Sequence, residues 1–349
     1  MKRTLYLIRH AMPDIPLGER WCVGGRSDPP LGPLGRLQAA LLPFAPELRG
    51  VETVFCSSLI RAKDTAAALC PSPVVMPGLE EQDMGAWDGL SFAQIKARFP
   101  ALYSAREENP SLLPEGAESE SEVRARMEAV LRRCLSESEG DIAVVSHRTA
   151  ISTLTGRREL LTHTAYSALY WDGEAFSAGA VGLRPHPALT DGVCAALLSA
   201  AGCDEKIKAH CRAVADLADE LGAALRRKGV SLDAEAVRAA ALLHDIARKE
   251  ENHPALGALW LRELGWPELS EIVRQHHDPD GTELSEAAVV YIADKAVRGT
   301  ERVPIDERFA ASLKKCTTPE ARAANLRRYE AAKTIRNEIN QLCEEELIR

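Results

Sequence analysis

The feature that most constrains the fold is a change of sequence pattern near residue 185. Before it, short apolar runs rich in β-branched residues alternate with helical stretches, and after it the strand pattern almost vanishes. Alternating strands and helices are typical of an α/β sandwich around a mostly parallel sheet, whereas helical patterns alone indicate an all-α domain. We therefore expect two domains, which also suits a length of 349 residues.

The first region, residues 1–186, is predicted to form an α/β three-layer sandwich. Its expected strands lie at 4–8, 51–56, 73–76 and 142–145. Its expected helices lie at 35–42, 59–69, 92–98 and 120–135. Two further apolar runs at 165–171 and 175–183 flank Asp172-Gly173, a turn signal that predicts a β-hairpin closing the domain.

The second region is predicted to be helical, after a linker at 187–203. A long amphipathic helix should end at Gly229, because glycine commonly follows helix C-termini. Asp233 should cap the next helix through its carboxylate. We expect an all-α domain at 204–316, followed by a charged helical tail at 317–349.

Composition narrows the expected partners and the compartment. Lys and Arg total 43 against 51 Asp and Glu, for a net charge of −8, and neither half is basic, so nucleic acid is not an expected partner. No apolar run reaches the ~18 residues of a membrane span. The nine cysteines include no CxxC pair, which argues against a disulfide framework and favours a reducing cytoplasm. Composition leaves oligomerisation open.

Basic and imidazole side chains follow the ends of three predicted strands. Arg9-His10 ends the first strand, Ser57-Ser58 and Arg61 follow the second, and Ser146-His147 ends the fourth. Strand ends in a parallel sheet point into the ligand crevice. Arginine matches phosphate oxygens with its planar fork, a helix N-terminus favours anions, and a neutral imidazole can attack phosphorus. This set predicts a phosphate site.

These residues and several further motifs resemble the histidine phosphatase superfamily, which has the phosphoglycerate mutase-like fold. The motifs occur in the family's order as Arg9-His10, Ser58-Leu59-x-Arg61-Ala62, Leu79-x-Glu81, Gly85-x-Trp87-x-Gly89, Glu115-Gly116-Ala117-Glu118-Ser119 and Ser146-His147. The stretch Gly24-Gly25-Arg26-Ser27-Asp28-Pro29-Pro30-Leu31 is most similar to the alpha-ribazole phosphatase branch. The resemblance covers about residues 1–185.

The resemblance implies hydrolysis of a small phosphomonoester through a phosphohistidine, without a cofactor. His10 would be the nucleophile, and Glu81 would be the proton donor to the leaving alkoxide and later the base for water. Arg9, Arg61 and His147 would hold the phosphoryl group. About 185 residues leave little room for the additional loops of the mutases, which favours hydrolysis.

The chain departs from the family after each of the two histidines, where glycine is usual. Ala11 adds one methyl group, and Arg148 would add a phosphate contact or fill the pocket. Both departures bear on the choice of substrate more than on the chemistry. Arg148 is therefore a further candidate for substrate binding. Arg26, in the stretch that is similar to the alpha-ribazole phosphatase branch, is another.

Ionisable residues recur on the apolar faces of the second region. The candidate metal ligands are His210, His244, Asp245, His253, His276, His277 and Asp294. Burying such groups is costly unless they are paired or bound to metal, and several of them on separate helices are best explained by a shared cation. Nitrogen and oxygen ligands without thiolate suit Fe, Mn, Zn or Mg, and seven candidates exceed what one ion needs, so the set could hold two ions.

The same residues resemble the HD-domain metal-dependent phosphohydrolases over about residues 204–300. His244-Asp245 is the eponymous doublet, and His210 and Asp294 match the flanking ligands. The other three histidines match the extra ligands of binuclear members. The resemblance implies hydrolysis of a phosphate ester or anhydride, with a nucleotide as the expected substrate class. Arg248 stands where such members often have lysine, and it is a candidate for contact with a substrate phosphate.

Two functional interpretations stay open from the sequence. In the first, the chain is a cytoplasmic bifunctional phosphohydrolase that acts on small phosphorylated metabolites or nucleotides. In the second, one domain is catalytic and the other senses a nucleotide and regulates it. His163 and His186 belong to no motif of the sequence, so both are expected to be ordinary surface or loop residues.

Overall fold

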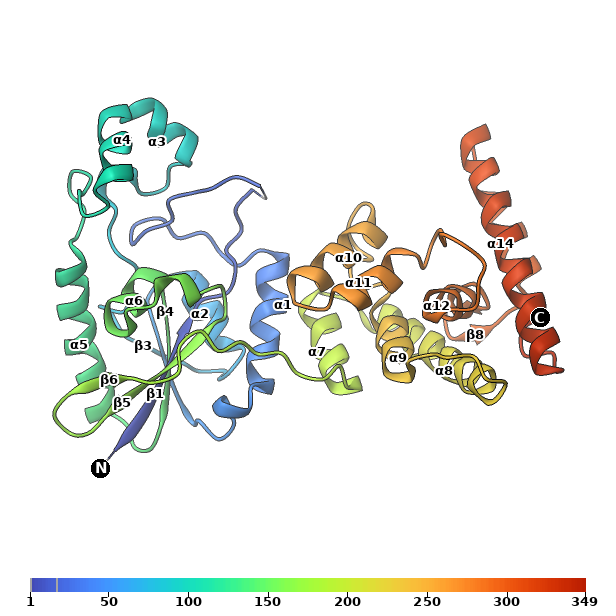
Figure 1. The fold of residues 1–349 in the computed structure, drawn as a ribbon, viewed down its shortest axis with the longest axis horizontal. Helices are drawn as coiled ribbons and strands as arrows, with labels where there is room; N and C mark the ends of the chain where they lie inside the picture. Colours follow the sequence, from blue (N-terminus) through green and yellow to red (C-terminus); the bar gives the residue numbers. More distant parts are fainter. Residues whose placement is uncertain (1, 17) are drawn as a thin grey trace. The chain divides into compact units, whose positions relative to one another are not determined.

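A computed structural model describes residues 2–16 and 18–349. The chain divides into two compact units, Met1–Pro187 and Ala188–Arg349 (Figure 1). Each unit has its own secondary structure and buries its own apolar side chains.

The first unit is built around a six-stranded sheet in the order β3-β2-β4-β1-β5-β6. The strands are β1 (Arg3–Arg9), β2 (Thr53–Cys56), β3 (Val74–Val75), β4 (Ile142–Ser146), β5 (Tyr166–Trp171) and β6 (Phe176–Ala178). The first four strands are parallel, and β5 and β6 form an antiparallel hairpin that continues the sheet beside β1. The predicted strands and hairpin are confirmed.

Helices cover both faces of this sheet, because successive side chains of each strand point to opposite sides. On one face, Leu7 of β1 shares a core with α5 (Glu120–Ser136) and α6 (Arg148–Thr155). On the other face, Ile8 of β1 shares a core with α2 (Ile60–Ala67). The unit is therefore the three-layer α/β sandwich that the sequence predicted (Figure 1).

The remaining helices of this unit are α1 (Pro33–Leu41), α3 (Phe92–Arg98) and α4 (Pro100–Glu108). Helices α1, α2, α3 and α5 occur where the sequence predicted helices, whereas α4 and α6 were missed. No residue of α4 is fully buried, and its nine residues are too few for a helical pattern to stand out in the sequence. Helix α6 spans only eight residues, which is shorter than the window over which a helical pattern can be recognised.

The pairing register brings three strand ends to one edge of the sheet. Arg9 of β1 lies opposite Ser146 of β4. The next residues, His10 and His147, therefore leave the sheet at the same edge, and Ser57 leaves it there after β2. This edge is the carboxyl end of the parallel strands, where ligands bind in open α/β sheets.

The second unit is helical apart from a short hairpin of β7 (Val297–Arg298) and β8 (Glu301–Arg302). Its helices are α7 (Asp191–Ala200), α8 (Glu205–Arg227), α9 (Ala234–Leu243), α10 (His253–Glu263), α11 (Pro267–Arg274), α12 (Glu286–Lys295), α13 (Ile305–Leu313) and α14 (Pro319–Cys343). Gly229 has a φ of +91° just after α8, and the Asp233 carboxylate accepts hydrogen bonds from two backbone N–H groups of α9, as predicted.

The segment 187–203 is not the linker that the sequence predicted, because α7 occupies most of it. The Thr190 hydroxyl caps this helix by accepting a hydrogen bond from the Val193 N–H. Val193 and Leu197 are buried, and α7 packs against α9 within the second unit. Since α7 has few polar residues, its sequence does not show the alternation of polar and apolar faces that identifies a surface helix.

The charged tail expected after residue 316 is helical, but one face of it belongs to the core. Ala332, Ile335 and Ile339 are fully buried, and α14 packs against α8, α12 and α13. The Tyr291 hydroxyl of α12 donates a hydrogen bond to the Arg328 carbonyl at 2.6 Å. The charged residues that dominate the sequence of α14 therefore lie around a narrow apolar stripe.

The structure adds two observations to the composition. None of the described helices is long and apolar enough to cross a membrane. All nine cysteines lie in the described part of the chain, and all nine are free thiols. Cys211, the neighbour of His210 in sequence, is fully buried.

We expect Ile335→Ala to lower the free energy of unfolding of the second unit by about 2–5 kcal/mol, because it leaves a cavity in the core. Urea unfolding with amide hydrogen exchange of α8 and α12 would measure the loss. Leu326→Ala is the matched control, since this leucine of α14 is 50% exposed and its loss should cost less than about 0.5 kcal/mol. Equal effects of the two variants would contradict the packing of α14.

Candidate phosphate-binding site and candidate metal centre

His10 follows β1 and is only 5% exposed. Its Nδ1 atom lies 2.7 Å from the carbonyl oxygen of Ala11. Because a carbonyl can only accept a hydrogen bond, Nδ1 carries the proton and Nε2 keeps its lone pair. The backbone therefore selects the tautomer in which Nε2 is the nucleophilic atom.

Arg61 lies in the first turn of α2, is fully buried and is held by carbonyl groups. Its Nη1 donates to the Ser27 carbonyl at 2.8 Å and its Nη2 to the Gly24 carbonyl at 2.9 Å. Its Nε donates to Nε2 of His10 at 3.3 Å. The guanidinium is thus fixed beside the nucleophilic atom of His10, and burial lowers the pKa of Arg61.

One carboxylate fixes the loop that supplies these carbonyl groups. Asp88 accepts hydrogen bonds from the backbone N–H groups of Gly24 at 3.1 Å, Arg26 at 2.9 Å and Ser27 at 3.1 Å. A Cβ atom on Gly24 would clash with the Asp88 carboxylate, so this close approach requires glycine. The loop is therefore rigid where it meets Arg61.

His147 is the residue that directly precedes the first turn of α6, and it is fully buried. Its Nε2 lies 2.9 Å from the hydroxyl of Ser57, and its Nδ1 has no hydrogen-bond partner among the described residues. The ring centroids of His10 and His147 are 4.9 Å apart. Burial lowers the pKa of both imidazoles well below the usual range, and nearby cationic side chains add to the effect. Both shifts favour the neutral form of the imidazole.

Arg9 completes the cationic lining, and it brings a residue that the sequence analysis did not assign to the site. Its Nη1 donates to the Leu161 carbonyl at 2.8 Å, and its Nη2 lies 2.9 Å from Nε2 of His163. The rings of His163 and His10 are 5.7 Å apart, and burial lowers the pKa of His163 to about 2. His163 does lie in a loop, as expected, but it is half-buried and belongs to the site, because β5 pairs with β1 and brings the residues before it beside Arg9.

Glu81 is 9% exposed, and the N-terminus of α6 holds its carboxylate. The carboxylate accepts hydrogen bonds from the backbone N–H groups of Thr149 at 3.1 Å and Ala150 at 3.2 Å. A helix N-terminus stabilises a carboxylate through these unpaired donors. The Glu81 charge opposes the effect of burial on the pKa of Arg61 and of Arg9, so the three groups share one site.

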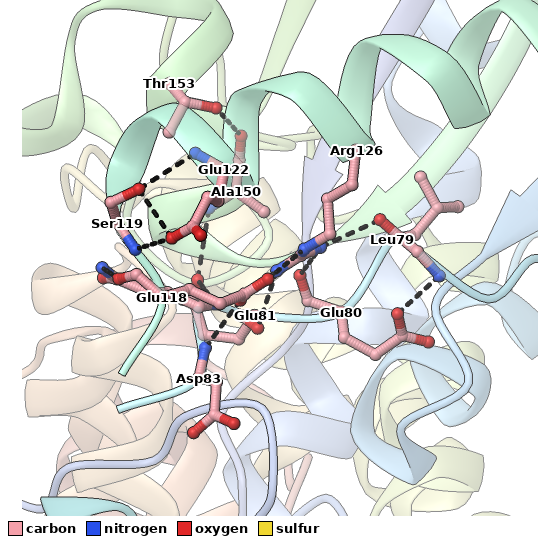
Figure 2. A network of polar contacts seen from close by, with 12 residues as sticks. Leu79, Glu80, Glu81, Asp83, Glu118, Ser119, Glu122, Arg126, Ala150 and Thr153 are labelled. Carbon is pink, nitrogen blue, oxygen red and sulfur yellow. Dashed lines mark hydrogen bonds and ion pairs between the residues drawn. The ribbon is translucent and has the colours of Figure 1, made fainter. Parts of the chain in front are cut away.

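Arg126 of α5 holds the loop that carries Glu81, as Figure 2 shows. Its guanidinium donates to the backbone carbonyls of Gly78 at 2.9 Å, Glu80 at 2.8 Å and Glu81 at 3.0 Å. It also forms an ion pair with Glu118 at 2.9 Å. Sequence analysis missed Arg126, because contacts with backbone groups far along the chain leave no motif.

The remaining candidates of the first unit differ in their surroundings. Ala11 is fully buried, as its place beside the nucleophile requires. Arg148 is exposed, and its charge adds to burial in lowering the pKa of Arg9 to about 10, so it borders the site. Arg26 is exposed too, and its Nε forms an ion pair with Asp83 at 2.8 Å.

The second unit brings the predicted ligands into two groups. They are His210, His244 and Asp294 in the first group, and His253, His276 and His277 in the second. Within each group the candidate ligand atoms lie within 4.8 Å of one another. The seventh candidate, Asp245, lies between the groups.

The carboxylate of Asp245 reaches both groups. Its Oδ2 lies 3.7 Å from Nε2 of His244, and its Oδ1 lies 3.3 Å from Nε2 of His253 and 3.7 Å from Nε2 of His276. A carboxylate with one oxygen toward each group can bridge two cations. All seven predicted ligands therefore converge.

Three buried polar atoms of this cluster have no hydrogen-bond partner in the described part of the chain. They are Nε2 of His244, Nε2 of His276 and Oδ1 of Asp245. Each histidine has Nδ1 beside a backbone carbonyl, at 2.7 Å from Ala241 and 2.6 Å from Val273, so Nε2 carries the lone pair. Unpaired buried acceptors are costly, and divalent cations would satisfy all three. The residues therefore fit a metal centre.

Two basic side chains flank the ligands. Nζ of Lys295 lies 2.6 Å from Oδ2 of Asp294 and donates to the His276 carbonyl at 3.1 Å. Nη1 of Arg248 lies 3.0 Å from Nε2 of His253. Arg248 lies beside the ligands, as its predicted contact with a substrate phosphate requires. Lys295 directly follows the ligand Asp294 in the sequence, and no motif predicts its role.

Comparisons with known families cover both units. Residues 5–173 match the family model for the histidine phosphatase superfamily, branch 1. Residues 207–299 match the family model for the HD domain. HD domains are metal-dependent, which agrees with the two groups of ligands in the second unit.

Curated relatives match parts of the chain. An uncharacterized protein of Methanocaldococcus jannaschii is 35% identical over 125 residues, which cover 30% of this chain and 74% of that protein. A bifunctional protein of Mycobacterium tuberculosis is 35% identical over 156 residues, which cover 43% of this chain and 42% of that protein. The match thus spans less than half of this relative's length. Glucosyl-3-phosphoglycerate phosphatase of Mycobacterium tuberculosis is 29% identical over 186 residues, which cover 50% of this chain and 82% of that protein.

Solved structures also match part of the chain. Mycobacterial glucosyl-3-phosphoglycerate phosphatase complexed with VO3 is 27% identical, with a TM-score of 0.44, and covers 52% of this chain and 98% of its own. The alpha-ribazole phosphatase from Shigella flexneri is 22% identical, with a TM-score of 0.44, and covers 53% of this chain and 98% of its own.

We expect Asp245→Asn to remove more divalent metal from the purified chain than His210→Ala or His277→Ala, because the Asp245 carboxylate lies near both groups. Each histidine variant should lose about one equivalent, as measured by elemental mass spectrometry after gel filtration. His163→Gln in the first unit is the control and should leave the metal content unchanged. A full complement of metal in Asp245→Asn would contradict the bridging position.

Proposed function

Because the chain belongs to the histidine phosphatase superfamily through residues 5–173 and carries an HD domain over residues 207–299, we propose that it is a bifunctional phosphohydrolase. The first unit hydrolyses a small phosphomonoester by way of a phosphohistidine. The second unit uses divalent metal to hydrolyse a phosphate ester or anhydride of a nucleotide-type substrate. The observation that carries the first activity is the lone pair of His10 Nε2 beside the guanidinium of Arg61.

In the first step of the phosphatase reaction, Nε2 of His10 attacks phosphorus. Its lone pair forms the N–P bond while the P–O bond to the leaving group breaks and the leaving oxygen takes the electron pair. Arg9 and Arg61 neutralise the oxygens of the transferred phosphoryl group, and neutral His147 supplies a further hydrogen bond. Water then attacks phosphorus, the N–P bond breaks, and inorganic phosphate leaves with His10 neutral again.

Glu81 moves the protons in both steps. Its carboxyl group donates a proton to the leaving alkoxide, and the resulting carboxylate takes a proton from the attacking water. The N-terminus of α6 and the guanidinium of Arg126 support this role, because they hold the side chain and its loop in place.

The nature of the phosphomonoester follows from the relatives and from two residues of this chain. A relative named glucosyl-3-phosphoglycerate phosphatase favours a small phosphorylated metabolite as the substrate. Buried Ala11 and exposed Arg148 stand where the family usually has glycine, so they adapt the pocket to a substrate of this chain's own.

In the second unit, the two groups bridged by Asp245 would hold the metal, and their nitrogen and oxygen donors suit Fe, Mn, Zn or Mg. When bound, divalent ions neutralise phosphate oxygens and lower the pKa of water. Arg248 binds the phosphate group at the centre, because its guanidinium lies beside two of the ligands. Lys295 orients Asp294 through their ion pair.

We expect His10→Ala to reduce phosphomonoesterase activity of the full chain on the order of 10³-fold or more, because the nucleophile is lost. The assay is release of 4-nitrophenol from 4-nitrophenyl phosphate in the presence of EDTA. Wild-type activity should persist in EDTA, since the first unit needs no metal. Asp245→Asn is the matched control and should keep this activity while losing metal-dependent hydrolysis of nucleotides.

Two results would contradict this division of labour. One is loss of all turnover in EDTA, and the other is unchanged phosphatase activity in His10→Ala. A second unit that binds a nucleotide without metal and without hydrolysis would instead favour the regulatory interpretation.

Arg126→Met should lower kcat about 10- to 100-fold on an alkyl phosphate such as glycerol phosphate, because Glu81 is no longer held for proton donation. The loss on 4-nitrophenyl phosphate should be smaller, since nitrophenolate leaves without a proton. Arg133→Met, an exposed residue of the same helix, is the control and should leave kcat unchanged on both substrates. Equal losses on the two substrates would contradict this positioning role.

A further inference from the structure

The metal centre of the second unit opens into a cavity of about 570 Å³. This volume lies within the range of roughly 300–1,000 Å³ that is typical of small-molecule sites. Four candidate ligands are among its lining residues, namely His210, Asp245, His277 and Asp294. Residues of α13 and α14, and of the segment between them, line it as well. The size of the cavity fits a compact ligand.

The lining is strongly basic. It contains seven lysine and arginine residues, but only two acidic residues, Asp245 and Asp294, both of which belong to the metal centre. The whole chain has a net charge of −8, so the positive charge is local to this cavity. One phosphate group carries at most two negative charges near neutral pH, which is fewer than the seven positive charges that line the cavity.

Four of these cations have no carboxylate within ion-pair distance among the described residues. They are Lys206, Arg298, Arg308 and Lys315. Arg328 pairs with Asp278 through one nitrogen, but its Nε is buried without a hydrogen-bond partner among the described residues. Unpaired cations that line one cavity repel one another unless an anion lies between them.

Three of the basic residues lie outside the matched HD segment, which ends at residue 299. Arg308 is on α13, Lys315 follows it, and Arg328 is on α14. We call these three residues the C-terminal wall. Burial of Ile335 and Ile339 fixes α14 in the core, and Asn325 of α14 donates to the Ser312 hydroxyl at 2.9 Å, so the wall has a defined place beside the cavity.

We propose that the C-terminal wall binds a second phosphate group of the substrate, and that the second unit therefore acts on compounds with at least two phosphate groups. This inference rests on the proposed function, because the first phosphate is the one at the metal centre. Arg248 would hold that phosphate together with the metal that the ligands bind, while Arg308, Lys315 and Arg328 receive the other. Guanidinium groups suit this task, because they match phosphate oxygens with a planar fork.

The test compares two probes that differ by one phosphorus group. Methylenediphosphonate has two such groups and a bridge that hydrolysis does not cleave, whereas orthophosphate has one. Isothermal titration of the full, metal-loaded chain in excess Mg²⁺, with metal content checked afterwards, should show at least tenfold tighter binding of methylenediphosphonate. Arg308→Gln and Lys315→Gln should each weaken that probe about tenfold, a typical loss for one charge-assisted hydrogen bond. Both variants should bind orthophosphate as the wild type does.

Lys314→Gln is the matched control, because this exposed neighbour does not line the cavity and its loss changes the net charge equally. Unchanged binding of both probes by Lys314→Gln supports a specific wall. The proposal is overturned if wild-type protein binds methylenediphosphonate no more tightly than orthophosphate, or if Lys314→Gln weakens it as much as Arg308→Gln. Failure of the proposed function is distinguishable, since the metal-loaded chain would then bind nucleotides without hydrolysing them while the difference between the probes persisted.

Discussion

The completely buried guanidinium of Arg61 sets the architecture of the first site. A buried cation loses its hydration, so its place in the fold is tolerable only where the protein supplies acceptors. The carbonyls of Ser27 and Gly24 supply two of them, and Nε2 of His10 supplies the third. The same contacts hold the loop of Gly24 and Ser27, which Asp88 also binds, and they place Arg61 beside Nε2 of His10. The need to satisfy one buried side chain thus organises the pocket.

The buried polar groups of the second site also need partners, but here they are acceptors instead of a cation. Carbonyl groups fix Nδ1 of His244 and His276, and both Nε2 lone pairs are left without partners in the described part of the chain. Asp245 lies between them with an equally unpaired oxygen. Where the first unit satisfies its buried cation with two backbone carbonyls and an imidazole nitrogen, the second collects acceptors that need a cation. This difference underlies the division between metal-free and metal-dependent hydrolysis that we propose.

Site residues that lie at strand ends or recur in helical patterns are predictable from the sequence. Residues that act by binding backbone groups are not. His10 and His147 follow predicted parallel strands, so their proximity could be inferred. His163 could not, because its place depends on the antiparallel pairing of β5 with β1. Arg126 binds carbonyls more than 40 residues away in the chain, and a backbone acceptor has no signature in the sequence. The sequence predicts a linker where α7 lies, because this helix lacks a polar face.

The amino-acid sequence by itself determined the two fold classes, the tandem order of the units and the identities of the candidate nucleophile and metal ligands. These properties depend on local hydrophobic patterns and on short motifs, which are readable along the chain. Only the tertiary structure decided the His10 tautomer, the bridging position of Asp245, the support of Glu81 by Arg126 and the basic wall at the cavity. Each of these depends on distances between atoms remote in sequence, and such distances are set by packing rather than by any local pattern.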